Sequence, residues 1–156
     1  MKQFLSRLVF GALFAAGGAA IAAGTAADPV IGTWKLDVAK SMFGAGPAVK
    51  AQTRTYSQSA QGITLNMKTV GADGKETTVQ TTYQLDGKDY PVKGAAEYDS
   101  LSAKQIDSNT AEFTLKKGGK TVGTTRRTVS MDGKTLTATS KNVNAKGEDT
   151  FVFSKQ

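Results

Sequence analysis

Residues 62–83 read GITLNMKTVGADGKETTVQTTY, which is two alternating segments joined by a turn. In both segments, core-forming side chains occupy every second position and polar side chains lie between them. A period of two places one face of a strand against a core and the other face in water. The Asp73-Gly74 step is typical of a tight hairpin, because Gly adopts positive φ without steric cost. The stretch therefore predicts a hairpin with strands over 62–70 and 76–85.

Turns of this kind recur along the rest of the chain. They lie at Ala72-Asp73-Gly74-Lys75, Leu85-Asp86-Gly87-Lys88, Lys117-Gly118-Gly119-Lys120, Met131-Asp132-Gly133-Lys134 and Ala145-Lys146-Gly147-Glu148. From Asp28 onward the chain has 19 Thr and only 6 Leu, a balance that favours strands over helices. Strands are predicted near 31–37, 50–58, 62–70, 76–85, 88–93, 98–106, 110–117, 120–130, 134–142 and 148–155. A single helical turn around Val38 to Phe43 is compatible with the pattern.

Short connections between these sequential segments predict an antiparallel meander. Closing a meander into a barrel removes its exposed edges. The alternative, a two-sheet sandwich, needs longer crossovers, for which only residues 38–49 and 93–98 are candidates. We therefore predict an all-β fold, an up-and-down antiparallel barrel of about 8–10 strands.

Alternation also predicts which side chains face the interior. The large ones are Ile63, Leu65, Met67, Val79, Tyr83, Phe113, Leu115, Phe151 and Phe153. Between them lie several Thr, Ala and Ser positions. Small barrels either fill their interior with side chains or hold one small ligand, so this thin filling favours a cavity.

The strand over 120–130 carries Val, Thr and Arg on both faces, so its orientation must come from its turns. If Met131-Asp132-Gly133 forms the three-residue loop expected for Ala72-Asp73-Gly74, Arg126 lies opposite Ala138 and points inward. A two-residue Gly118-Gly119 turn leads to the same orientation. A slip of one residue would place Arg127 inside instead, so Arg126 is favoured and Arg127 is the alternative.

Two residue types are absent from the 156 residues: the chain has no Cys and no His. Disulfides, thiolate nucleophiles and Cys-ligated metal sites are therefore excluded. The commonest general base, metal ligand and haem ligand are excluded with His. The carboxylates Asp107, Glu112, Glu148 and Asp149 fall at turns or outward positions, so we expect no enzyme activity, no cofactor and no metal.

The first 27 residues have the pattern of a secretory signal peptide. Lys2 and Arg7 precede an apolar run over 8–23, and small residues lead to Asp28. A membrane-spanning helix needs roughly 20 apolar residues, and this run is shorter and interrupted by Gly. We predict cleavage after Ala27, with Ala22 as the alternative, which leaves a single domain over 28–156. The loss of two basic residues lowers the net charge from +7 to +5.

A resemblance enters at Gly32-Thr33-Trp34-Lys35-Leu36, at the start of the first predicted strand. A Gly-x-Trp motif there, ahead of a Gly-punctuated meander, resembles the lipocalin and fatty-acid-binding-protein superfamily, the calycins. Together with Gln52-Thr53-Arg54-Thr55-Tyr56 and Gly123-Thr124-Thr125-Arg126-Arg127, it is similar to small exported bacterial lipocalin-like proteins. The likeness extends over 29–155 and implies a periplasmic or secreted bacterial protein.

The resemblance implies a barrel whose base is plugged by Trp34. In many lipocalins a late basic residue packs over that Trp, and Arg126 or Arg127 is the local candidate. In the fatty-acid-binding branch, an Arg and a Tyr two residues apart on a late strand hold the ligand carboxylate. Here Arg126-Arg127-Thr128 has Thr in place of that Tyr, whereas Arg54-Thr55-Tyr56 has the spacing early in the chain. The Thr-Asp-Tyr motif of lipocalins and the helix pair of the fatty-acid-binding branch are missing, which leaves the ligand class open.

An inward arginine requires partners, because an isolated buried cation costs several kcal/mol. The inward set contains no carboxylate, so the predicted partners of Arg126 are neutral: Tyr56, Tyr83, Thr124, Thr128 or backbone carbonyls. Trp34 offers its ring for a cation–π contact. We predict that ligand contacts come from Arg126, Arg54, Tyr56, Tyr83, Phe113 and Trp34.

Two function classes remain. The leading hypothesis is an exported protein that holds a small apolar or amphipathic ligand, with an acid group near Arg126 and aided by Arg54 if that residue faces inward. The alternative is a ligand-free structural or protein-interaction barrel of the cell envelope, in which Arg126 only closes the base over Trp34. The two would be separated by a continuous internal void lined by Tyr56, Tyr83, Phe113 and Phe151.

The expected partners follow from charge and compartment. The basic residues are scattered over turns and outer faces without interleaved aromatic residues, so nucleic acid is not expected. No integral membrane segment remains after cleavage. Weak attraction to anionic envelope surfaces is compatible with the net charge.

Overall fold

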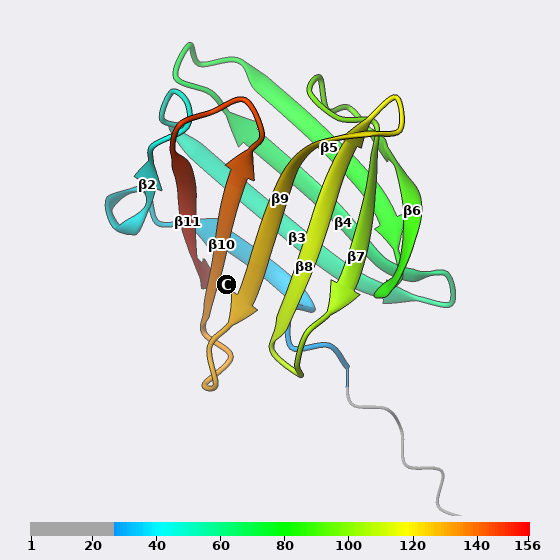
Figure 1. Ribbon diagram of the computed structural model, residues 1–156. Helices are drawn as coiled ribbons and strands as arrows, with labels where there is room; N and C mark the ends of the chain where they lie inside the picture. Colours follow the sequence, from blue (N-terminus) through cyan, green and yellow to red (C-terminus); the bar gives the residue numbers. More distant parts are fainter. Residues whose placement is uncertain (1–26) are drawn as a thin grey trace, which may run out of the picture.

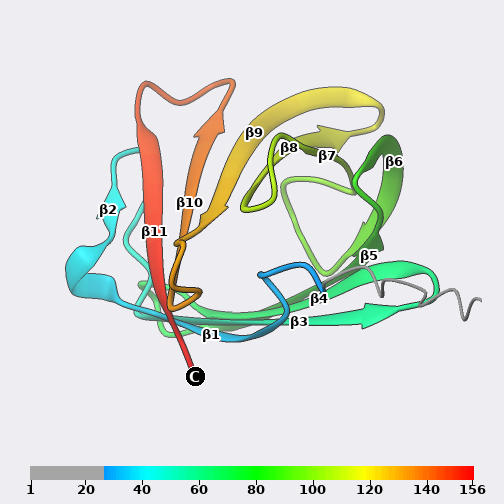
Figure 2. The same ribbon diagram turned by 90° about the horizontal axis from the view of Figure 1, so that it is seen from below.

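Ten antiparallel strands close into a barrel in the computed structural model, which describes residues 27–156 (Figures 1 and 2). They are β1 (Gly32–Leu36), β3 (Ala51–Ser59), β4 (Gly62–Val70), β5 (Glu76–Tyr83), β6 (Asp86–Lys93), β7 (Ser100–Gln105), β8 (Thr110–Lys117), β9 (Lys120–Val129), β10 (Thr135–Asn142) and β11 (Glu148–Lys155). From β3 onward each strand pairs with the next in sequence. Strand β1 pairs with both β3 and β11, which closes the ring. The predicted up-and-down barrel is confirmed and the sandwich is excluded.

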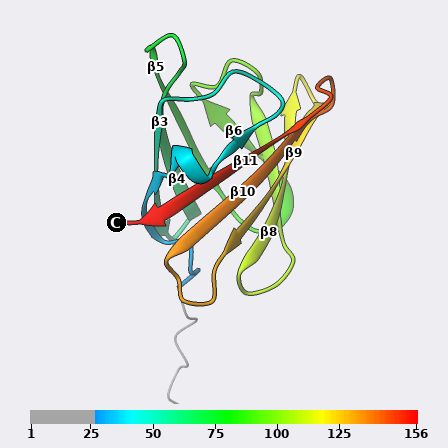
Figure 3. The same cartoon turned by 90° about the vertical axis from the view of Figure 1, so that its left-hand side faces the viewer.

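The connection from β1 to β3 is the longest in the barrel. A 3-10 helix, η1 (Val38–Lys40), begins after Asp37, whose carboxylate accepts the Lys40 N–H. The two-residue strand β2 (Met42–Phe43) follows and pairs with β11 on the edge that β1 also uses, so it continues the barrel wall beyond β1 (Figure 3). The predicted helical turn is therefore confirmed over 38–40 only.

We call the two ends of the barrel the base and the mouth. The base carries the segment 27–31 and the turns β3–β4, β7–β8 and β9–β10 (Figure 1). The mouth carries the turns β4–β5, β8–β9 and β10–β11 and the segments 44–50 and 94–99. The predicted signal peptide lies outside the described residues except for Ala27. Within residues 27–156, no helix is long and apolar enough to cross a membrane.

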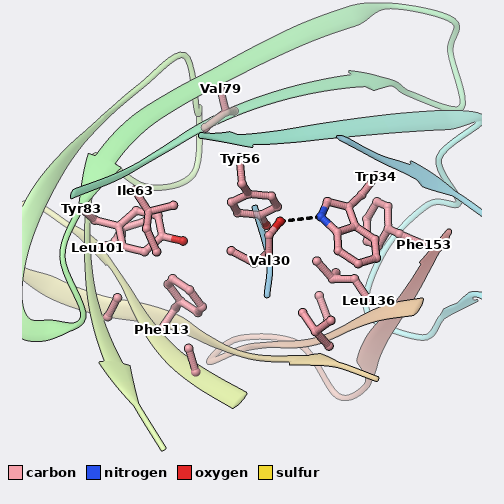
Figure 4. Close-up of a cluster of buried hydrophobic side chains, with 14 of the residues drawn as sticks. Val30, Trp34, Tyr56, Ile63, Val79, Tyr83, Leu101, Phe113, Leu136 and Phe153 are labelled. Atoms are coloured by element: carbon pink, nitrogen blue, oxygen red, sulfur yellow. Dashed lines mark hydrogen bonds between the residues drawn. The ribbon is translucent and has the colours of Figure 1, made fainter. Parts of the chain in front are cut away.

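The core is concentrated toward the base. The largest side chains without solvent exposure are Trp34, Tyr83, Phe153, Leu136, Val30 and Val129. Figure 4 shows the Trp34 ring against Leu136 and Phe153, with its Nε1–H donating to the Val30 carbonyl at 2.7 Å. The segment before β1 thus folds under the barrel, and Trp34 plugs the base as the resemblance implied.

One predicted turn has another role. The Leu85-Asp86-Gly87-Lys88 turn was expected to join two paired strands, but strand β6 already begins at Asp86 and pairs there with β7. Only two residue pairs join β5 to β6, and the Thr81 hydroxyl completes the contact by donating to the Pro91 carbonyl at 2.9 Å. The barrel wall is therefore held by few backbone pairs at this seam.

The register of β9 differs from the prediction by one residue. The β4–β5 hairpin has the expected three-residue loop, with Thr69 opposite Thr77. The β9–β10 connection is one residue longer, because Ser130 N–H bonds to the Thr135 carbonyl, and Val129 rather than Thr128 lies opposite Leu136. At the other end of β9 a bulge shifts the register between Leu115 and Lys116. The bulge and the longer loop each shift the pairing of β9 by one residue, which exchanges its inward and outward faces.

Arg126 therefore points outward, and the prediction that it lines the interior is wrong. Its side chain is 55% exposed and forms an ion pair with Glu112 at 2.8 Å. Arg127, the alternative left open by the sequence, occupies the interior and is 3% exposed.

Candidate functional site

A cavity of about 510 Å³ lies inside the mouth half of the barrel. Such a volume is typical of small-molecule sites. Its apolar wall comes from alternate positions of β4, β8 and β11, through Leu65, Met67, Leu115 and Phe151. The four residues expected around an internal void, Tyr56, Tyr83, Phe113 and Phe151, all line it.

Two mouth segments complete the cavity wall. Residues 43–49 contribute Phe43 and Pro47, and residues 94–99 contribute Tyr98. Phe43 packs edge-on against Phe151, with ring centroids 5.6 Å apart. The first segment is held by the Ala45 N–H, which donates to the Asp149 carboxylate at 2.8 Å. The upper part of the cavity is thus bordered by connections as well as by strands.

Arg127 lies on the cavity floor with several partners. One guanidinium nitrogen, Nη1, donates to the Tyr83 hydroxyl at 2.8 Å, and Nη2 lies 3.5 Å from a carboxylate oxygen of Asp28. The rings of Tyr56 and Phe113 flank the guanidinium, 5.5 and 5.3 Å from its central carbon. Its Nε is buried without a hydrogen-bond partner among the described residues. Tyr83 and Tyr56 were predicted as partners of the inward arginine, whereas the Asp28 carboxylate was not foreseen.

Electrostatics keep this group charged and its neighbour neutral. Burial lowers the pKa of Arg127, but its Coulomb interactions with Tyr83, Tyr56 and Asp28 outweigh this and raise it. Burial raises the pKa of the Tyr83 hydroxyl far above its usual value, and the Arg127 charge opposes this only in part. The cavity floor therefore presents a fixed cation beside a protonated phenol.

Arg54 lies higher in the wall, on β3, and faces inward. Its Nε donates to the Gln52 side-chain oxygen at 2.8 Å, and Gln52 in turn donates to the Thr69 hydroxyl. Its guanidinium carbon lies 4.5 Å from the ring centre of Phe153 and 5.6 Å from that of Phe151. No ion pair within residues 27–156 involves Arg54, although Glu97 and Asp149 also line the cavity. Arg54 is therefore a buried cation whose Nη groups form no hydrogen bond in this part of the chain.

Trp34 belongs to the base and not to the cavity. It is fully buried, and the cation over its ring is Lys155, with the amine 5.2 Å from the ring centre. Neither Arg126 nor Arg127 takes that place, so the predicted stacking of Arg126 on Trp34 is wrong. Lys155 lies over Trp34 because the two residues are paired across β1 and β11. That pairing is not evident from the sequence.

Two participants were not predicted from the sequence. Gln52 orients Arg54, and its inward position follows from the same alternation that places Arg54 and Tyr56 inside. Tyr98 was placed at the start of the predicted strand over 98–106, but β7 begins only at Ser100, and Tyr98 lies in the connection before it. Burial raises the pKa of Tyr98, and the nearby Arg54 charge opposes that rise. Among the described residues no group of three or more acidic, His or Cys side chains could hold a metal ion.

The comparisons with known proteins concern the fold. No protein-family model matches the chain, and no curated protein matches it in sequence. Among solved structures, the barrel is similar to that of the wild-type fluorescent protein UnaG, with a TM-score of 0.56 and 16% sequence identity. The match covers 81% of this chain and 96% of that chain. At this identity the likeness concerns the fold alone, and it supports the closed up-and-down barrel of calycin type that the Gly-x-Trp motif led us to expect.

Proposed function

We propose that this protein binds one amphipathic molecule inside the barrel and holds its carboxylate, or a similar acid group, at Arg54. The observation that carries the proposal is a guanidinium that lines a cavity of about 510 Å³ and has no ion-pair partner among residues 27–156. The Arg54 guanidinium borders the cavity, and a ligand carboxylate would supply the counter-charge that the described residues do not.

The surroundings of Arg54 suit an acid with an apolar tail. Gln52 fixes Nε, which leaves the two Nη groups for the fork-shaped pairing that guanidinium makes with carboxylate. Phe151 and Phe153 support the guanidinium with their rings. Leu65, Met67 and Leu115 offer apolar surface to the remainder of the molecule.

The remaining parts of the proposal rest on the sequence. The pattern of residues 1–27 supports export, and we propose a periplasmic or secreted location. The absence of Cys and His supports a binding role without catalysis. The net charge supports weak attraction to anionic envelope surfaces.

Titration with a fluorescent fatty acid tests the site. We expect the Arg54→Gln variant to bind it about tenfold more weakly, because a charge-assisted hydrogen bond is lost. Arg126→Gln is the matched control, since it removes the same charge from an exposed position. A fatty alcohol of equal chain length should not distinguish the wild type from Arg54→Gln. Equal fatty-acid affinity of the two folded variants would exclude Arg54 as the acid site.

Native mass spectrometry addresses the identity of the ligand. Protein purified from its own host should carry one small molecule of acidic, amphipathic character. Protein that carries no molecule, and that also fails to bind any fatty acid, would favour the structural barrel over the binding protein.

A further inference from the structure

Two arginines are buried in the cavity wall, and only one of them has a counter-ion in the described residues. Arg127 lies beside the Asp28 carboxylate at 3.5 Å, with side-chain exposures of 4% and 13%. Arg54 has no such partner within the part of the chain that the structure describes. Both guanidinium groups line the same space. The cavity is therefore electrostatically asymmetric along its length.

The counter-ion of Arg127 comes from outside the barrel wall. Asp28 precedes β1, and its other carboxylate oxygen accepts the Val30 N–H at 2.9 Å. Val30 is fully buried, and its carbonyl accepts the Trp34 Nε1–H at 2.7 Å. These bonds fix the Asp28 carboxylate under the cavity floor. Both predicted cleavage positions would retain Asp28 in the mature chain.

We infer that Asp28 is a specificity-determining residue, which neutralises Arg127 and restricts the cavity to ligands with a single acid group, seated at Arg54. This inference rests on the proposed function. A second ligand carboxylate at the floor would face the Asp28 carboxylate across one guanidinium. Two carboxylates held on one guanidinium repel each other, and the single charge of Arg127 can balance only one of them. The floor then takes the uncharged end of the ligand, beside the protonated Tyr83 hydroxyl.

The preference between monoacid and diacid ligands distinguishes a specificity-determining role of Asp28 from a purely structural one. An Asp28–Arg127 pair that only tied the segment 27–31 to the barrel would leave the choice between ligands unchanged when broken. A pair that balances charge in the cavity controls that choice. The test must therefore compare ligands that differ by one acid group and are otherwise alike.

Calorimetric titrations with three probes make this comparison: dodecanoate, dodecanedioate and the monomethyl ester of dodecanedioate. We expect the wild type to bind dodecanoate and the monomethyl ester at least about tenfold more tightly than dodecanedioate, the size expected for one unfavourable charge contact. The comparison of diacid with monoester requires no variant, so it does not depend on how any substitution folds.

Asp28→Asn should then shift the choice. It removes the charge and keeps an oxygen for the Val30 N–H, and we expect dodecanedioate affinity to rise about tenfold while dodecanoate affinity stays within about threefold. Asp28→Ser is the second variant, and Asp132→Asn, an exposed carboxylate in a base turn, is the matched control for net charge.

The outcomes are distinct. If the wild type binds the monoacids but binds dodecanedioate equally well, or if the folded Asp28 variants gain nothing for the diacid, the role of Asp28 is refuted and the proposed function stands. If neither the wild type nor the Asp28 variants bind any probe, the inference and the proposed function fail together.

Discussion

The base and mouth halves of the barrel are built from the same strands, yet they fill their interiors differently. In β11, Phe153 has no solvent exposure at the base, whereas Phe151, two residues earlier, is only half-buried and borders the cavity. In β10, Leu136 and Ala138 are fully buried, whereas Ser140 faces the cavity. The barrel interior therefore changes from packed to open between one inward-facing side chain and the next along a strand.

The difference separates two tasks within one sheet. Dense packing at the base gives contacts that a void would forfeit, so this half supplies most of the apolar stabilisation. In the described part of the mouth half, apolar side chains and the Arg54 guanidinium border open space, which stabilises the chain less and leaves them accessible to a ligand. Stability and binding should therefore respond to substitutions in opposite halves.

Removing the plug from the base should have the largest effect. Trp34→Ala leaves a void beside Leu136 and Phe153 and an unpaired Val30 carbonyl, and we expect the free energy of unfolding to fall by about 3–5 kcal/mol. Urea unfolding followed by circular dichroism measures this. A loss below about 1 kcal/mol would contradict the assignment of the base as the stabilising half.

Substitution of Arg127, on the cavity floor between the two halves, should have the next largest effect on stability. Arg127→Gln removes the cation from Asp28 and Tyr83 and should cost about 2 kcal/mol, since hydrogen bonds to a charged group are lost and Asp28 stays half-enclosed. Arg126→Gln, on the next residue, should change stability by less than about 0.5 kcal/mol, because its pair with Glu112 is exposed. Similar losses in both variants would mean that the assigned faces of β9 are incorrect.

These neighbours also show what the sequence could predict. Period-two alternation placed the inner faces of β4, β5, β8 and β11 correctly, because burial on one face leaves a repeating signal. Strand β9 has no such signal, since Val, Thr and Arg occur on both of its faces. The assignment of its two faces then depended on loop lengths alone. An error of one residue in a loop exchanges the inward and outward faces of the strand.

The turns at the two ends of β9 both led to the same wrong prediction, that Arg126 faces inward. The Met131-Asp132-Gly133 loop includes Lys134 as a fourth residue, and a bulge follows the Gly118-Gly119 turn. Neither a bulge nor loop length has a reliable signature in residue types. The contribution of Asp28 was hidden for another reason: it lies before the first strand, where alternation says nothing about which side chains fold under the barrel.

A substitution in the mouth half should cost less. Phe151→Ala loses its contacts with Phe43 and Arg54 but borders a void already, so we expect a loss of about 1 kcal/mol in the free energy of unfolding. Fatty-acid affinity, measured by the same fluorescence titration, should fall as the support of Arg54 is removed. A loss as large as that of Trp34→Ala would show that the mouth half is as tightly coupled to folding as the base.

The smallest expected effect is the loss of stability in acid that comes from three carboxyl groups at the base. Hydrogen bonds from the Lys88 and Asn109 N–H groups lower the pKa values of Asp86 and Asp107, and a hydrogen bond from the Ser130 hydroxyl lowers that of Asp132. A carboxyl whose pKa is lower in the folded state than its unfolded value of 3.8 binds protons more weakly when folded. Its contribution is thus fully present well above pH 3.8 and is lost as the pH falls through the lower, folded value.

The melting temperature should accordingly be flat from neutral pH to about pH 5 and fall below about pH 4. A variant with Asn at all three positions should melt at a lower temperature near neutrality and show a shallower fall in acid, because it has fewer protons to take up on unfolding. Thermal melts from pH 7 to pH 2, followed by circular dichroism, compare the two curves. Because all three carboxyls are exposed and lie in base-end turns or, for Asp86, at the first residue of β6, the difference should stay small beside the loss in Trp34→Ala. Parallel curves would instead show that these turns hold their geometry without the charge, and that the packed side chains above them are enough to keep the base closed.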